Sequence, residues 1–88
     1  MFDRAERPGA ADEATRGLLR TLGSKVRSWR LEKGLSQTEF GKLANLNRSY
    51  IAEVEQGKRN VSLICLADLA KAMEITLAQL CEERHDPA

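Results

Sequence analysis

The spacing of apolar residues along the chain is helical. Leucine, valine and tryptophan side chains recur three or four residues apart between positions 18 and 29, which places them on one face of a helix. This spacing predicts a first helix that begins anywhere from Asp12 to Thr21 and ends at about Lys33, next to a glycine. Gly17 and Gly23 are expected to weaken the start of this helix.

Capping residues mark the starts of the helices that follow. Residues 36–39 have the S-x-x-E form and residues 76–79 the T-x-x-Q form, and both predict a capping box. Asn47 and Ser62 are good N-caps for two more helices, of which the earlier one is expected to end at Gly57. The pattern therefore predicts five helices.

Each of these helices has an apolar side that predicts its contribution to the core. The expected inner residues are Phe40, Leu43 and Ala44 in the second helix, Leu63, Leu66, Leu69, Ala70 and Met73 in the fourth, and Leu77 and Leu80 in the fifth. The sequence shows no strand pattern and no repeat. We expect an all-α domain over residues 14–83, with a flexible tail at 1–13 and a polar tail at 84–88.

The second and third helices are short, and four residues join them. In the connection 44–47, Asn45 suits a left-handed turn and Leu46 can fill the angle between the helices. Gly41 is small where the two helices must approach closely. Two short helices joined in this way form a helix-turn-helix, whose second helix enters the DNA major groove with its N-terminal end first.

A 100° wheel of the third helix separates an apolar face from a short polar one. The polar face carries the candidate base contacts Arg48, Ser49, Ala52 and Glu53. Arg48 can donate two hydrogen bonds to guanine, and Glu53 can accept one from cytosine or stay solvated and repel other sequences. Ser49 can bind a base or a phosphate, or simply support the helix start.

A second set of residues is expected to contact phosphates. They are Gln37, Asn47, Tyr50, Lys58, Arg59, Asn60 and Ser62. Gln37 lies at a helix N-terminus, where amides and the dipole favour an anion. The loop 58–60 is suited to contacts that position the protein without specifying a base. Tyr50 either reaches a phosphate through its hydroxyl or lies partly in the core.

The charge distribution agrees with a polyanionic partner without proving one. The chain of 88 residues has a net charge of only +1, but residues 20–60 hold nine basic and four acidic side chains, and 61–88 hold two and five. This asymmetry favours DNA next to the middle segment, although a solvated basic helical surface explains it equally well.

Composition excludes several other classes of function. No apolar run approaches the length of a membrane span, and the charged first 20 residues exclude a secretory signal, so we expect a cytoplasmic protein. Cys65, Cys81 and the single His85 fit no metal spacing. The sequence has no nucleophile–base pair and no phosphate-binding glycine loop, so we expect neither an enzyme nor a cofactor, and no small-molecule effector is evident.

Two stretches of the chain carry a family resemblance. GLSQxxFGxLA from residue 34 and YIxxVExG from residue 50 resemble the phage-repressor and Cro-like helix-turn-helix family over residues 21–82. Residues 47–51 and 59–60 look most like the controller proteins of restriction–modification systems. The resemblance implies a compact five-helix, lambda-repressor-like bundle, a homodimer, a two-fold symmetric double-stranded operator, and regulation of the protein's own promoter.

The resemblance also implies roles for single residues. Arg30 and Glu55 look like the family's structural ion pair between the first and third helices, and the family's glutamine at position 37 commonly touches the DNA backbone. The family often has Ala, Gly and Ser where this chain has Gly41, Asn45 and Ala52. Since Ala52 lacks a hydroxyl, the resemblance does not supply a base contact there.

Five apolar residues toward the end of the chain are hard to hide in one small bundle. They are Leu63, Met73, Ile75, Leu77 and Leu80. With the acidic C-terminal segment, they suggest a dimer surface on the fourth and fifth helices, away from the DNA, so that two copies read half-sites about 34 Å apart.

Two other interpretations stay open. An antitoxin of the same fold would bind a toxin as well as its own promoter, although residues 1–13 have little of the apolar content needed to cover a toxin. Separately, Arg4 and Arg7 could form an arm along the DNA.

Overall fold

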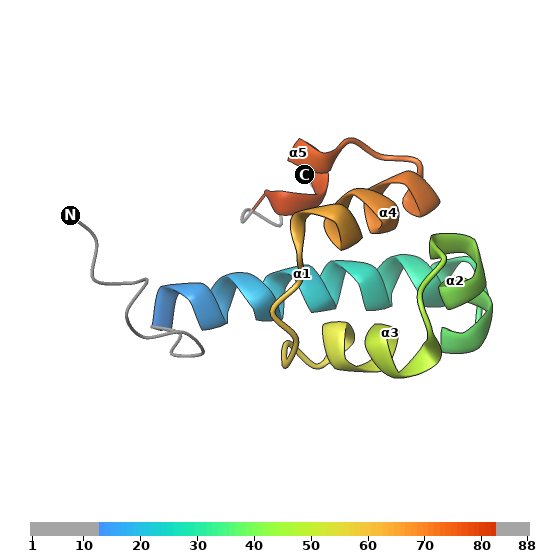
Figure 1. The fold of residues 1–88 in the computed structure, drawn as a ribbon, viewed down its shortest axis with the longest axis horizontal. Helices are drawn as coiled ribbons and strands as arrows, with labels where there is room; N and C mark the ends of the chain where they lie inside the picture. Colours follow the sequence, from blue (N-terminus) through green and yellow to red (C-terminus); the bar gives the residue numbers. More distant parts are fainter. Residues whose placement is uncertain (1–12, 83–88) are drawn as a thin grey trace.

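The computed structural model describes residues 13–82, which form five helices and no strand (Figure 1). They are α1 (Glu13–Glu32), α2 (Gln37–Ala44), α3 (Arg48–Glu55), α4 (Leu63–Met73) and α5 (Leu77–Cys81). α1 runs through the middle, with α3 along one side, α4 and α5 along the other, and α2 near its C-terminal end (Figure 1). The predicted all-α, five-helix fold is confirmed.

The four predicted N-caps fix where the short helices begin. In the box before α2, the Ser36 hydroxyl accepts the Glu39 amide at 3.0 Å and the Glu39 carboxylate accepts the Ser36 amide at 2.8 Å. Thr76 and Gln79 repeat this arrangement at 3.0 and 2.8 Å before α5. Each box satisfies amides that have no partner inside the helix, so these starts are determined locally. The hydrogen bonds from Ser36 also lower the pKa of the Glu39 carboxyl.

All five helices contribute to one core. Its buried apolar residues are Leu22, Val26, Phe40, Ala44, Ile51, Val54, Leu69, Ala70, Met73 and Leu80. Two leucines that we expected inside are exposed: Leu43 is 59% and Leu63 is 68% accessible. α2 buries only the stripe of Phe40, Gly41 and Ala44. Leu63 is the first residue of α4, at the edge of that helix's buried stripe.

α1 begins earlier than the centre of its expected range. Glu13, which we expected in the N-terminal tail, is its first residue. A carboxylate in the first turn interacts favourably with the helix dipole, and Glu13 also pairs with Arg20 at 3.1 Å. Residues 1–12 and 83–88 lie outside the described residues, and with them lie the proposed Arg4 and Arg7 arm and His85.

Gly23 allows α1 and α3 to pack backbone against backbone. A Cβ atom at this position would lie 2.3 Å from the Val54 carbonyl oxygen and 2.8 Å from that of Glu55. Our expectation that Gly23 merely weakens α1 was therefore incomplete. The residue sets the distance between the central helix and α3.

Lys25 ties the C-terminal end of α5 to α1. Its ammonium group donates to the backbone carbonyls of Gln79 at 2.9 Å, Leu80 at 3.3 Å and Glu82. The last carbonyls of a helix have no partner within it, and a cation at that end also complements the dipole. Lys25 belongs to the basic middle of the sequence, but its charge is used inside the fold.

Candidate nucleic-acid interface

The turn between α2 and α3 has the conformation that its residues predict. Asn45 adopts a left-handed conformation with φ 62° and ψ 39°. The Leu46 amide donates to the Gly41 carbonyl at 2.8 Å, and the half-buried Leu46 side chain packs against the core. A Cβ on Gly41 would lie 2.4 Å from the Leu46 carbonyl oxygen. The angle between α2 and α3 therefore depends on two residues: Gly41, which has no side chain to separate the helices, and Asn45, which adopts the left-handed conformation that the turn requires.

α3 turns one face into the core and the other outward. Ile51 and Val54 are 0% and 1% accessible. Of the four expected base contacts, Arg48 and Ser49 are exposed, whereas Ala52 and Glu53 are half-buried. The first turn is held by the Asn47 side-chain oxygen, which accepts the Tyr50 amide at 2.8 Å. The Asn47 amide group can still donate to a phosphate.

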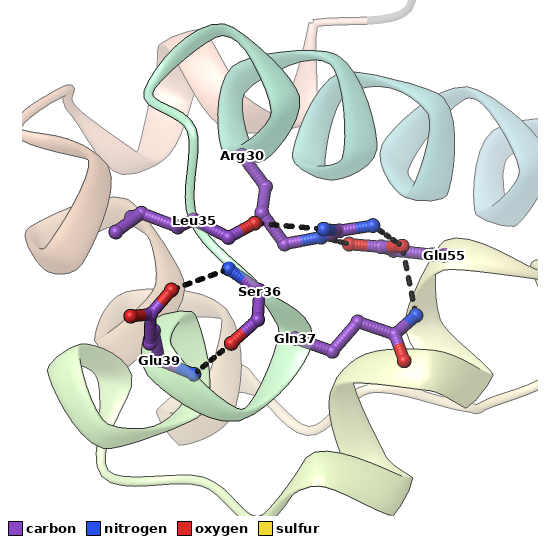
Figure 2. A network of polar contacts seen from close by, with 6 residues as sticks. All are labelled: Arg30, Leu35, Ser36, Gln37, Glu39 and Glu55. Carbon is purple, nitrogen blue, oxygen red and sulfur yellow. Dashed lines mark hydrogen bonds and ion pairs between the residues drawn. The ribbon is translucent and has the colours of Figure 1, made fainter.

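Arg30 and Glu55 form a buried ion pair between α1 and α3, as the resemblance implied (Figure 2). Arg30 Nε lies 2.6 Å from Glu55 Oε2 and Nη2 lies 3.0 Å from Oε1, so the contact is bidentate. Arg30 Nη1 also donates to the Leu35 carbonyl at 2.8 Å. The hydrogen bond with Glu55 raises the pKa of Arg30, although burial opposes this effect.

Gln37 joins this network from the start of α2. Its Nε2 donates to Glu55 Oε1 at 3.1 Å, which ties the first turn of α2 to the last turn of α3 (Figure 2). We expected Gln37 to contact a phosphate, and its amide nitrogen retains a second N–H for this purpose. No local pattern indicates the link to Glu55, because the two residues are 18 positions apart.

Arg59 lies over α3 instead of extending into solvent. Its guanidinium carbon is 4.6 Å from the centroid of the Tyr50 ring, and its Nε is 3.0 Å from Glu53 Oε1. The buried Nε has no hydrogen-bond partner, so the contact with Glu53 is an ion pair without hydrogen-bond geometry. Glu53, an expected base contact, thus forms one cluster with Tyr50 and Arg59, two expected phosphate contacts. We did not predict this cluster from the sequence. Helical spacing places Glu53 three residues after Tyr50, but nothing local indicates that the loop folds back over them.

Tyr50 is half-buried against the core and interacts with Ser62 and Cys65 at the start of α4. Burial and the nearby Cys65 thiol raise the pKa of Tyr50 to about 12, whereas the Ser62 backbone and Arg59 act in the opposite direction. The structure therefore agrees with the interpretation that Tyr50 lies partly in the core, with Arg59 over its ring, and a contact of its hydroxyl with a phosphate stays a prediction. Ser62 uses its hydroxyl oxygen to accept the Cys65 amide at 3.1 Å and so caps α4.

The remaining phosphate candidates, Lys58 and Asn60, are exposed on either side of Arg59 in the loop between α3 and α4. The Lys58 amide donates to the Glu53 carbonyl at 2.9 Å, which fixes the start of the loop against α3. The basic loop and the polar face of α3 are thus adjacent.

The proposed dimer surface needs correction. Met73 and Leu80 are 5% and 1% accessible within the single chain, so they are core residues and are not available to a partner. Ile75 and Leu77 are half-buried, and only Leu63 is largely exposed. Ile64, which we did not expect at this surface, is 74% exposed beside Leu63.

Within residues 13–82, no group of three or more histidine, cysteine or acidic side chains could hold a metal ion. None of the helices in that range is both long and apolar enough to cross a membrane.

Comparison with known proteins agrees with this geometry. Residues 26–80 match the family model described as helix-turn-helix. The chain is 42% identical over 60 residues to the control protein C.MunI of Mycoplasma, covering 67% of this chain and 81% of that protein. It is 41% identical over 59 residues to the control protein C.SmaI of Serratia marcescens, covering 67% and 70%.

Among solved structures, the chain resembles the restriction–modification controller protein C.AhdI from Aeromonas hydrophila. The TM-score is 0.66 at 44% identity, and the match covers 70% of this chain and 94% of the other. The family match includes α2, α3 and the turn between them, together with the residues that hold them in place. The chain belongs to the helix-turn-helix family of DNA-binding transcriptional regulators.

Proposed function

We propose that this protein binds, as a homodimer, a two-fold symmetric operator, with α3 in the major groove. The observation that supports this most is the exposed N-terminal end of α3, which carries Arg48 and Ser49 while the opposite face of the helix is buried. A recognition helix needs a fixed orientation as well as exposed polar groups. Gly41 and the Arg30–Glu55 pair fix α3 against α2 and α1.

The contacts divide into those that specify and those that position. Arg48, exposed in the first turn, is suited to a guanine, and Ser49 to an adjacent base or phosphate. Lys58 and Asn60, with Asn47 and Ser62 at two helix starts, are suited to the phosphates on either side. We therefore expect the protein to act by binding, without catalysis and without a cofactor.

We further propose that the protein is a cytoplasmic controller of a restriction–modification system that regulates its own promoter. The similarity to three control proteins, at 41–44% identity, supports this assignment. We infer that protein concentration sets operator occupancy through dimerisation. The proposed dimer surface is Leu63 and Ile64 on α4, with the half-buried Ile75 and Leu77.

The deciding experiment is selection of bound sites from a random duplex pool at about 0.15 M salt, where loose electrostatic binding is weakened. We expect an inverted repeat whose half-site centres are about 10 bp apart. Absence of enrichment by the folded protein would overturn the proposal and make the antitoxin alternative the leading one. That alternative would be tested by copurification with a protein encoded by an adjacent gene.

Arg48→Ala tests the recognition helix within the same assay. It should cost about 1–3 kcal/mol of binding free energy and relax the preference at one base position per half-site. Lys71→Ala is the matched control, since it removes an equal charge from an exposed position on α4. A uniform loss of affinity for all sequences would instead assign Arg48 to a phosphate.

A further inference from the structure

The cluster of Tyr50, Glu53 and Arg59 holds a basic side chain next to the recognition face of α3. Arg59 stacks on the Tyr50 ring at 4.6 Å while its Nε lies 3.0 Å from Glu53 Oε1. The Arg59 and Glu53 side chains are 43% and 47% exposed. An arginine expected to bind phosphate thus already faces an anion of the protein itself.

The contact with Glu53 holds Arg59 only weakly. Arg59 Nε has no hydrogen-bond partner, and exposed ion pairs contribute little to stability. The Tyr50 ring, by contrast, is anchored by its packing against the core. A DNA phosphate can therefore replace the Glu53 carboxylate while the guanidinium stays near the ring.

This exchange has a consequence for Glu53. Glu53 shares the outward face of α3 with Arg48 and Ser49, so binding brings its carboxylate toward the major groove. While Arg59 is beside it, its charge is balanced. Once Arg59 moves to a phosphate, the carboxylate is repelled by the DNA unless a base beside it donates a hydrogen bond, as the amino groups of cytosine and adenine do.

We propose that Glu53 makes the phosphate contact of Arg59 depend on base sequence, an inference that rests on the proposed function. At a correct site, the released carboxylate accepts from a base amino group and Arg59 binds the backbone. At other sites, Glu53 retains Arg59 and one phosphate contact is lost. Glu53 is therefore a specificity-determining residue that acts by penalising wrong sequences through Arg59.

A double-mutant cycle tests this coupling. Glu53→Gln, Arg59→Ala and the double variant are compared with the unaltered protein on the selected operator and on a scrambled duplex of equal length. Glu53→Gln should raise affinity for the scrambled duplex about three- to tenfold. It should also steepen the slope of log affinity against log salt concentration by an amount equivalent to about one more released counterion. In the Arg59→Ala background the same substitution should leave the salt dependence unchanged, because there is no arginine to release, although affinity rises as the unbalanced carboxylate no longer repels the DNA.

Three results would overturn the inference, each in a different way. The same change in salt dependence in both backgrounds would mean that Glu53 releases no arginine and only repels phosphates. A lower affinity of Glu53→Gln for both duplexes would mean that Glu53 positions Arg59 for binding. If the unaltered protein binds neither duplex, the proposed function fails together with the inference. Glu74→Gln, at an exposed position that caps the end of α4, controls for the charge change, and circular dichroism checks that every variant is folded.

Discussion

Tyr50 connects α3 to the start of α4, and it is the only tyrosine in the chain. Burial, with the Cys65 thiol, raises its pKa from about 10 to about 12. The neutral phenol is therefore favoured in the folded state. Its contribution to stability should be fully present below pH 10 and lost as the pH rises through 12.

Phenolate absorbance of the folded protein should accordingly appear with a midpoint near pH 12, well above that of the chain in denaturant. Tyr50→Phe keeps the ring under Arg59 and removes the titrating group. Its free energy of unfolding should change less between pH 10 and 12 than that of the unaltered protein. A folded-state midpoint near 10 would contradict the packing described for this side chain.

Arg30 is the buried charge on which the orientation of α3 depends. Its side chain is 9% exposed and that of Glu55 only 2%. Arg30→Met would leave the Glu55 carboxylate buried with only Gln37 as a side-chain partner in the present network. It should lower the free energy of unfolding by about 3–5 kcal/mol, measured by urea denaturation.

Arg30→Met combined with Glu55→Leu separates loss of the pair from loss of one partner. Replacing both charges by apolar groups should recover part of the stability, because no buried carboxylate is left unpaired. If Arg30→Met alone cost less than about 1 kcal/mol, the pair would behave as an exposed one, contrary to its burial.

Contacts between residues close in the sequence could be predicted, whereas contacts between residues far apart in the sequence could not. The caps at Ser36, Asn47 and Thr76 were predicted because each joins residues three positions apart. The Arg59 cluster and the Gln37 link join residues that no periodicity relates, so only the fold reveals them. The Arg30–Glu55 pair, 25 positions apart, came from family resemblance and not from spacing.

At the scale of the helices, the wrong predictions of burial have one cause: not every apolar residue on the inner side of a helix is covered. Leu43 and Leu63 satisfy helical periodicity yet are exposed. α2 buries only a narrow stripe, and Leu63 is the first residue of α4. Lys25 and Gly23 were interpreted by residue type alone. Their roles depend on which helix lies opposite, and a single sequence does not specify that.

Gly23→Ala tests the close contact of α1 with α3. Alanine is the better helix former, so α1 alone would gain about 1 kcal/mol. The added Cβ would nevertheless lie 2.3 Å from the Val54 carbonyl oxygen, which is backbone and cannot rotate away. We expect a net loss of about 1–3 kcal/mol in the free energy of unfolding.

Gly17→Ala is the matched control on the same helix. Its Cβ would meet only the end of the Arg20 side chain, at 3.8 Å. This variant should be neutral or slightly stabilising in thermal denaturation. Stabilisation by both substitutions would mean that α1 and α3 can separate without cost.

For the whole molecule, the arrangement of the helices separates two surfaces. α2 and α3 with the basic loop carry the residues suited to DNA, whereas α4, on the other side of α1 from α3 (Figure 1), begins with the exposed Leu63 and Ile64. Two neighbouring aliphatic side chains that are 68% and 74% exposed are unfavourable in a monomer. A second copy that covered them would leave both recognition helices free.

Replacing Leu63 and Ile64 by glutamine should therefore weaken the proposed dimer while leaving the fold and the net charge intact. Since buried aliphatic anchors each contribute about 1 kcal/mol or more, the dimer Kd should rise at least about tenfold in sedimentation equilibrium. Affinity for an isolated half-site should not change, whereas affinity for the full inverted repeat should fall with dimerisation. Leu31→Gln, at a 53% exposed position on α1, controls for loss of an exposed leucine. An unchanged dimer Kd in the double variant would mean that the interface lies on another face and does not include the exposed apolar residues at the start of α4.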